Sequence, residues 1–141
     1  MAETDQPDYT GERAKHLDMI HGVVSRLAGN SAVMKRYCIV MVAVGVAIYK
    51  TIGDPRAVAA LVVMVAVFWL LDSRYLQHER WFRNHYDQVR VEPPERRPDF
   101  RMTPDKVLRD RVSFWGRVFS WSTAGLYLPL IALLGLFWRT L

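Results

Sequence analysis

The stretch from Arg56 to Arg90 constrains the fold of this chain more than any other. Every residue from Ala57 to Leu71 is apolar, and the chain then continues without Gly or Pro into a strongly charged segment. Because no helix breaker interrupts it, the whole stretch is predicted to form one helix. Extended by its neighbours to about 20 residues, the apolar run is long enough to cross a bilayer. We therefore predict a membrane span at 56–75 that continues as a cytosolic helical stalk at 76–91.

A second apolar block, at 37–49, precedes this stretch. It is shorter than the roughly 20 residues that a span needs. If Lys35 and Arg36 extend their side chains toward lipid head groups, a span over 32–52 repairs the shortfall. A buried helix of a soluble bundle is the alternative, and the neighbouring second apolar block argues against it.

The third apolar block gives a span at 114–138, with Trp115 and Trp121 near one end and Trp138 near the other. Aromatic side chains of this kind favour the two membrane interfaces. The fold class predicted for residues 1–141 is therefore all-α, a polytopic membrane protein with three transmembrane helices in a single membrane domain.

The remaining segments are assigned by local signals. We predict a flexible tail at 1–11, followed by an amphipathic helix at 12–29 whose apolar residues recur at helical spacing. Gly29, Asn30 and Ser31 predict a break before the first span. Thr51–Pro55 forms a tight turn between the first two spans, and 92–112 forms a proline-rich connector that contains a short helix.

The distribution of Lys and Arg predicts the orientation of the spans. Ten of these residues lie in 72–112 and five in 1–36, whereas the turn between the first two spans holds only Lys50 and Arg56. Loops rich in Lys and Arg stay in the cytoplasm. The N-terminus and the stalk are therefore predicted inside, and the C-terminus outside.

An apolar stripe follows the predicted stalk. Tyr75, Phe82, Tyr86 and Val89 recur at spacings of seven, four and three, which places them on one helix face. Such a stripe requires a partner, and we predict a partner or oligomer interface here. The N-terminal amphipathic helix, the membrane surface and another protomer are the three alternatives.

Arginine side chains in and beyond the stalk suggest a second kind of site. Arg80 and Arg83, together with Arg117 at the start of the third span, are predicted to bind an anionic ligand or lipid head groups. The alternative is a solvated stalk in which Arg83 pairs with Glu79 and Asp87 along the helix.

A mildly polar stripe marks the third span. Ser120, Thr123 and Tyr127 are spaced by three and four residues and so share a face. Hydrogen bonding between packed helices is one interpretation. The wall of a pore made by several protomers is the other. Ala43 and Ala47, four residues apart in the first span, likewise predict a close-packing face.

The chain lacks the patterns of catalytic and cofactor sites. It has no Gly-rich phosphate loop, no G-x-S-x-G and no Cys-x-x-Cys, so we predict neither an enzyme nor a cofactor. A metal site built from His78 and His85 with His16 and His21 is an alternative to ordinary interface histidines, although metal helices normally show tighter spacing. The net charge is +5, but the Lys and Arg residues are interleaved with Asp and Glu, which argues against a nucleic-acid partner.

The string from Asp72 to Arg90, D-x-x-Y-L-x-x-E-R-x-F-R-x-x-Y-D-x-V-R, is the most specific pattern in the chain. With HLDMIHGVVSRLAGNSAVMKRY before it and STAGLYLPLIALLGL after it, residues 16–137 resemble a family of small bacterial membrane proteins of unassigned function. More loosely, a hairpin followed by a cytosolic helix is similar to SLATT-type effectors of bacterial conflict systems. That likeness implies oligomerisation and membrane permeabilisation on a cytosolic cue. This chain departs from it in its third span and in lacking a recognisable sensor domain.

Two functions follow as hypotheses. The first is a non-enzymatic, homo-oligomeric effector or pore-type component of a bacterial defence or stress system, located in the cytoplasmic (inner) membrane. The alternative is an accessory or scaffold membrane protein whose stalk recruits a cytosolic protein partner.

Overall fold

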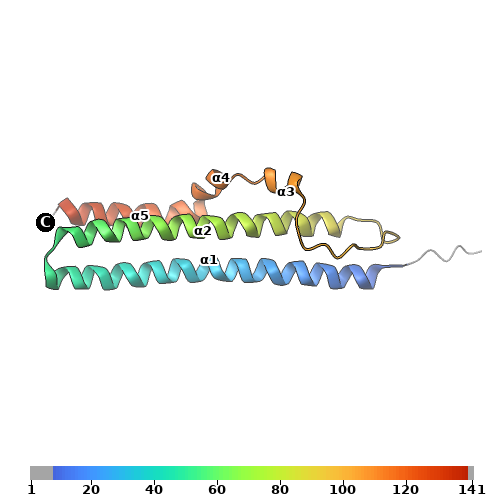
Figure 1. The fold of residues 1–141 in the computed structure, drawn as a ribbon, viewed down its shortest axis with the longest axis horizontal. Helices are drawn as coiled ribbons and strands as arrows, with labels where there is room; N and C mark the ends of the chain where they lie inside the picture. Colours follow the sequence, from blue (N-terminus) through green and yellow to red (C-terminus); the bar gives the residue numbers. More distant parts are fainter. Residues whose placement is uncertain (1–7, 140–141) are drawn as a thin grey trace, which may run out of the picture.

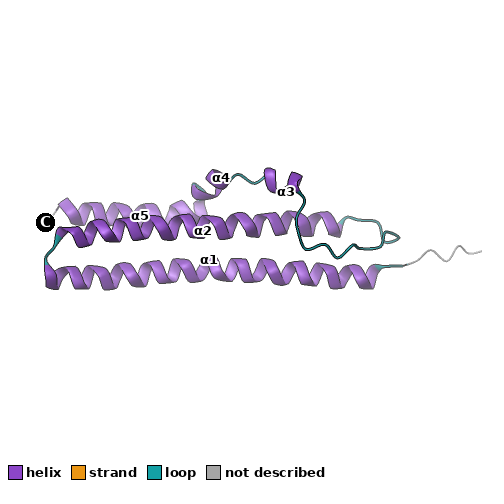
Figure 2. Ribbon diagram, in the orientation of Figure 1, coloured by secondary structure: helices purple, strands orange, loops and turns teal. Residues whose placement is uncertain are grey.

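The computed structural model describes residues 8–139, which contain helices and loops and no strand (Figures 1 and 2). Most of the tail predicted at 1–11 lies outside the described residues, and the first helix already begins at Thr10. The helices assigned within the described residues are α1 (Thr10–Ile52), α2 (Pro55–Arg90), α3 (Lys106–Asp110), α4 (Phe114–Val118) and α5 (Trp121–Arg139).

The turn between α1 and α2 forms as its sequence predicts. Gly53 adopts the left-handed conformation with φ of 71°, and its N–H donates to the Tyr49 carbonyl at 2.7 Å. A residue with a side chain is strained in this conformation, whereas Gly is not. Asp54 then caps α2 by accepting a hydrogen bond from the Arg56 N–H at 2.9 Å, and Pro55 occupies the first turn. The two helices therefore run antiparallel as a hairpin.

The break predicted at Gly29–Ser31 is wrong. The helix α1 passes through all three positions, so the amphipathic segment 12–29 and the first span 32–52 are one helix. The reason is tertiary contact: Ser31 is buried and donates a hydrogen bond to Asp72 of α2, while Gly29 and Asn30 lie on the exposed face. Packing of this kind overrides the roughly 1 kcal/mol by which Gly disfavours a helix relative to Ala.

Three helices are long and apolar enough to cross a membrane, namely α1, α2 and α5. At 1.5 Å per residue, α1 and α2 extend about 65 and 54 Å, well beyond the roughly 30 Å of a bilayer core. As predicted, the apolar and charged halves of Pro55–Arg90 form one unbroken helix. Figure 1 shows α5 beside only the half of the hairpin nearest the turn, where the apolar blocks lie.

The core of this apolar half joins all three of these helices. Cys38 of α1, Leu61 and Val65 of α2, and Tyr127 and Leu134 of α5 form one buried cluster. The helices α1 and α2 pack tightly at Gly45, where an added Cβ would lie 2.3 Å from a Leu61 methyl carbon. Ala43 and Ala47, by contrast, are exposed on the outside of the protomer.

The third span begins later than the sequence predicts. The predicted helix 114–138 is divided into α4 and α5 by a break at Phe119 and Ser120. Side chains donate to carbonyls at the break: Trp69 Nε1 donates to the Val118 carbonyl at 2.9 Å, and Thr123 Oγ1 donates to the Arg117 carbonyl at 2.6 Å. Pro129 lies within α5, which continues through it.

The connector between α2 and α4 passes the far end of the hairpin and returns along α2 (Figure 1). Gln77 Nε2 donates to the Val112 carbonyl at 3.1 Å, and Trp81 Nε1 donates to the Arg109 carbonyl at 3.1 Å. These bonds hold the returning segment, including α3, against the stalk.

Candidate functional site

A buried ion pair lies where α1 and α2 leave the apolar half of the molecule. Asp72 is 0% exposed, and its Oδ2 is 2.7 Å from Lys35 Nζ. Ser31 donates to the other carboxylate oxygen and accepts a hydrogen bond from Lys35 Nζ at 2.8 Å. A charge removed from water is tolerated only when it is paired and hydrogen-bonded in this way. The arrangement defines the register of the hairpin.

This pair differs from the sequence prediction, in which the Lys35 side chain extends toward lipid head groups. A signal was available in the spacing of the two residues from the turn. Lys35 precedes Gly53 by 18 residues, and Asp72 follows Asp54 by 18 residues. Residues equally distant from the turn of an antiparallel helical hairpin lie at the same level, because both helices rise 1.5 Å per residue.

The apolar stripe of the stalk is covered within the protomer. Val89 is buried with Ile20 and Val24 of α1, and Phe82 and Tyr86 pack against this cluster. The N-terminal part of α1 therefore packs on the stripe, which is one of the three alternatives that the sequence left open. The fourth predicted member, Tyr75, is half-buried and lies outside the cluster.

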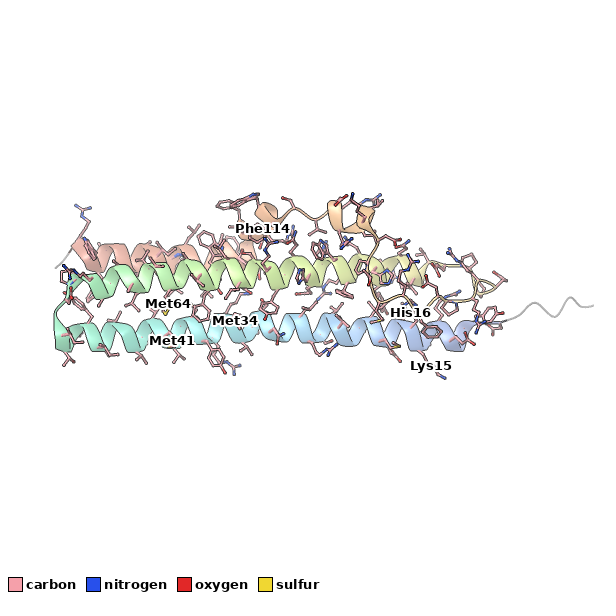
Figure 3. All side chains as sticks on the ribbon, in the orientation of Figure 1. Lys15, His16, Met34, Met41, Met64 and Phe114 are labelled. Carbon is pink, nitrogen blue, oxygen red and sulfur yellow. The ribbon has the colours of Figure 1, made fainter. Side chains whose placement is uncertain are left out.

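Two buried histidines hold the connector to the hairpin. The Nε2 atoms of His16 and His85 lie 3.0 and 2.8 Å from the same oxygen, the Arg101 carbonyl. Because a carbonyl only accepts hydrogen bonds, both Nε2 atoms must carry a proton. Figure 3 shows His16 on the side of α1 that faces α2, with Lys15 on the opposite side.

The connector backbone is shaped to reach both rings. Phe100 has a φ of 53°, an uncommon conformation for a residue with a side chain, and its ring packs against His16. The Arg101 N–H donates to Asp99 at 2.9 Å, and this bond, with the positive charge of Arg101, lowers the pKa of the Asp99 carboxyl. Arg13 adds a second attachment by donating to the carbonyls of Pro93 and Arg96. We call His16, His85 and Arg13 the connector clamp.

The histidines do not meet in the set suggested for a metal. His16 and His85 are neighbours, with ring centroids 5.9 Å apart, but His78 packs against Trp81 and His21 against Tyr86. Among residues 8–139, no group of three or more His, Cys, Asp or Glu side chains is arranged to hold a metal ion. Partial burial, and to a smaller extent the positive charge of Arg74, lowers the pKa of His78.

The structure brings together the three arginines predicted to bind an anion. Arg80 and Arg83 of α2 line one groove with Arg117 of α4, and the cavity volume is about 370 Å³. We call it the arginine groove. Its full lining is Leu76, Glu79, Arg80, Arg83, Arg117, Ser120, Trp121 and Ser122.

A second groove lies between α1 and α2 and shares two of these arginines. We call it the hairpin groove; its volume is about 380 Å³. It is lined by His21, Val24, Arg80, Arg83, Tyr86 and Asp87. The side chains of Arg80 and Arg83 therefore form the ridge that separates the two grooves.

The polar stripe of the third span is turned mostly toward the protomer interior. Thr123 and Tyr127 are completely buried, and the Tyr127 ring stacks on Trp69 with a centroid distance of 6.2 Å. Ser120 is half-buried and lies 3.1 Å from Thr123, hydroxyl to hydroxyl. Neither Thr123 nor Tyr127 is available to line a water-filled path on the outside of this protomer.

The fold and these sites define an all-helical protein in which three helices are suited to a membrane. Two of them, α1 and α2, form a hairpin that extends beyond the apolar region and is held by the connector clamp. Comparison with protein-family models, curated proteins and solved structures finds no match.

Proposed function

We propose that this protein is a non-enzymatic accessory or scaffold protein of a bacterial cytoplasmic membrane, which presents a rigid helical hairpin to a cytosolic protein partner. The observation that carries the proposal is the continuity of α1 and α2 through both the apolar and the charged halves. The connector clamp and the buried Lys35–Asp72 pair restrict motion between the two helices. A stalk with these restraints is suited to holding a surface at a constant height above the bilayer.

The orientation belongs to the same proposal. The charged half of the hairpin and the connector carry most of the Lys and Arg residues, whereas the turn at Gly53 carries few. This asymmetry favours a cytosolic stalk and N-terminus, with the hairpin turn and the C-terminus on the outer side.

The partner would bind at the hairpin groove rather than at the apolar stripe, because α1 already covers the stripe. His21, Arg80, Arg83 and Asp87 are all exposed at this groove. Arg83 is paired with Glu79, whereas Arg80 forms no ion pair among the described residues, so the free charge of Arg80 favours an acidic segment of the partner.

Site-specific photo-crosslinking in cells tests this proposal. A photoreactive residue at His21 or Asp87 should give an adduct with one cytosolic protein, and a second substitution, Arg83→Glu, should abolish it. Arg117→Glu is the matched control, because it makes the same change of charge outside the hairpin groove and should leave the adduct unchanged. Adducts formed only between copies of this chain would contradict the scaffold and support a homo-oligomer.

An oligomeric membrane effector of a defence or stress system is the second candidate. The observation in its favour is the exposure of Ala43 and Ala47, whose small side chains would let a second copy approach α1 closely. A pore, however, would need a polar face other than Thr123 and Tyr127. Induced expression with a membrane-potential dye separates the candidates: depolarisation supports the effector, and an unchanged potential supports the scaffold.

A further inference from the structure

We propose that the arginine groove binds the phosphate-bearing headgroup of an anionic phospholipid in the leaflet on the stalk side of the membrane. The groove joins parts of the chain that are distant in sequence. Arg80 and Arg83 come from the stalk, whereas Arg117 comes from the short helix that precedes the third span. This site goes beyond the proposed scaffold and does not depend on a protein partner.

The position of the groove along α2 matches the depth of lipid head groups. The apolar run ends at Leu71, and the lining residues Leu76 and Arg80 follow at about 7 and 13 Å along the helix axis. Arginine side chains are long enough to reach back toward the interface. On the other wall, α5 begins at Trp121, so the groove lies between the end of one apolar segment and the start of another.

Exposed aromatic side chains indicate that this region contacts the membrane surface. Trp121 is 92% exposed, and Phe119 and Trp115 are also largely exposed. Exposing such large rings to water is unfavourable, whereas the membrane interface is where Trp is most often found. Because these rings surround α4 and the start of α5, they place the arginine groove next to lipid rather than in open cytosol. This is the reason for choosing a lipid over a soluble phosphorylated ligand.

The charge and the free donors of the groove match a phosphate. Glu79 is 2.7 Å from Arg83 Nε and offsets one of the three positive charges. Within the described part of the chain, Arg80 and Arg117 form no ion pair, and the buried Arg117 Nε has no acceptor. A phosphate in the groove would accept hydrogen bonds from the guanidinium groups of Arg80 and Arg117, because guanidinium groups bind phosphate strongly. Leu76 and Trp121 offer apolar surface for the glycerol and the first acyl carbons.

Binding of phosphatidylglycerol to the purified full-length protein in neutral detergent, counted by native mass spectrometry, tests the proposal. Phosphatidylcholine serves as the lipid of equal size without net charge. The double variant Arg80→Gln/Arg117→Gln should bind phosphatidylglycerol about 30-fold more weakly, from about 1 kcal/mol per basic residue. Its binding of phosphatidylcholine should not change.

A control and a second variant keep the test decisive. Arg90→Gln/Arg109→Gln removes the same charge from exposed positions outside the groove and should retain binding. Ser122→Glu adds a carboxylate at the exposed rim without removing any arginine and should weaken binding as the double variant does. Equal losses in the groove and control variants would overturn the proposal, because they would indicate unspecific attraction. Displacement of phosphatidylglycerol by millimolar glycerol 3-phosphate would overturn the lipid assignment in favour of a soluble ligand.

Discussion

Lys35 and Asp72 form an ion pair, 2.7 Å between Nζ and Oδ2, at the level where both helices of the hairpin change from apolar to charged. The carboxylate is fully buried, and the lysine is only partly exposed. Leaving either charge without its partner at this depth is strongly unfavourable. The pair therefore specifies which residues of α1 lie opposite which residues of α2, and it does so at the boundary between the apolar and the charged halves of the hairpin.

The first prediction concerns this pair. Asp72→Leu leaves Lys35 without a counter-charge and should destabilise the fold by about 3 kcal/mol, the lower end for a broken buried pair because Lys35 is partly exposed. The double variant Lys35→Met/Asp72→Leu removes both charges and should recover most of that loss. Thermal unfolding in detergent, followed by circular dichroism, measures both effects. A double variant no more stable than Asp72→Leu would contradict the coupling.

The second prediction concerns the connector clamp. His16→Leu/His85→Leu removes both donors from the Arg101 carbonyl, and an unsatisfied buried group costs about 1–3 kcal/mol. The connector should open more often, so trypsin should cleave after Arg96 and Arg101 about tenfold faster, with the helices intact. His78 forms no hydrogen bond to the connector backbone, so the His78→Leu variant should be cleaved at the unchanged rate. Equal rates in the two variants would show that the histidines do not hold the connector.

Local sequence patterns predicted the elements whose structure depends on residues close together in the chain. The apolar blocks predicted the three candidate spans, and Gly53, Asp54 and Pro55 predicted the turn, because each signal lies within its own element. The continuity of α1 through Gly29 was not predicted, because it depends on the contact between Ser31 and Asp72. The shared contact of His16 and His85 with the Arg101 carbonyl was not predicted for the same reason, since the path of the connector decides it.

For the candidate sites, too, some features could be predicted from the sequence and others could not. Residue type and helix spacing selected Arg80, Arg83 and Arg117 for an anion, and the structure places all three at one groove. Spacing could not decide whether the face of Thr123 and Tyr127 is turned inward or outward. Their burial against α2 and the adjoining backbone results from the break before α5, which the apolar sequence around Phe119 does not signal.

The third prediction concerns the close approach of α1 and α2 at Gly45. Gly45→Ala places a methyl group against the buried Leu61 side chain and should destabilise the hairpin by about 1–3 kcal/mol. Gly29→Ala is the matched control, because nothing lies within 4 Å of its added Cβ, and it should stabilise α1 by up to about 1 kcal/mol. The midpoints of thermal unfolding should therefore shift in opposite directions. A stabilising Gly45→Ala would contradict the tight contact.

The fourth prediction concerns pH. Burial and the nearby Arg74 lower the pKa of His78, so the folded protein binds a proton there less readily than the unfolded chain does. The stabilisation is therefore present above the ordinary pKa of about 6.5 and is lost as pH falls below it. His78→Gln should flatten the decline of the unfolding temperature between about pH 7.5 and pH 5.5. A decline of unchanged steepness in this variant would exclude His78 as a contributor.

The last prediction concerns topology. Cys38 is the only cysteine and is buried, so Cys38→Ala provides a background for single reporter cysteines. Thr51→Cys at the turn should react with a membrane-impermeant maleimide in intact cells, because few basic residues flank the turn. Glu95→Cys in the connector should react only after the cytoplasmic membrane is permeabilised. Both positions are exposed in the fold, so an absent reaction reports the membrane barrier rather than burial. Labelling of Glu95→Cys but not of Thr51→Cys in intact cells would invert the orientation and place the two grooves outside the cytoplasm.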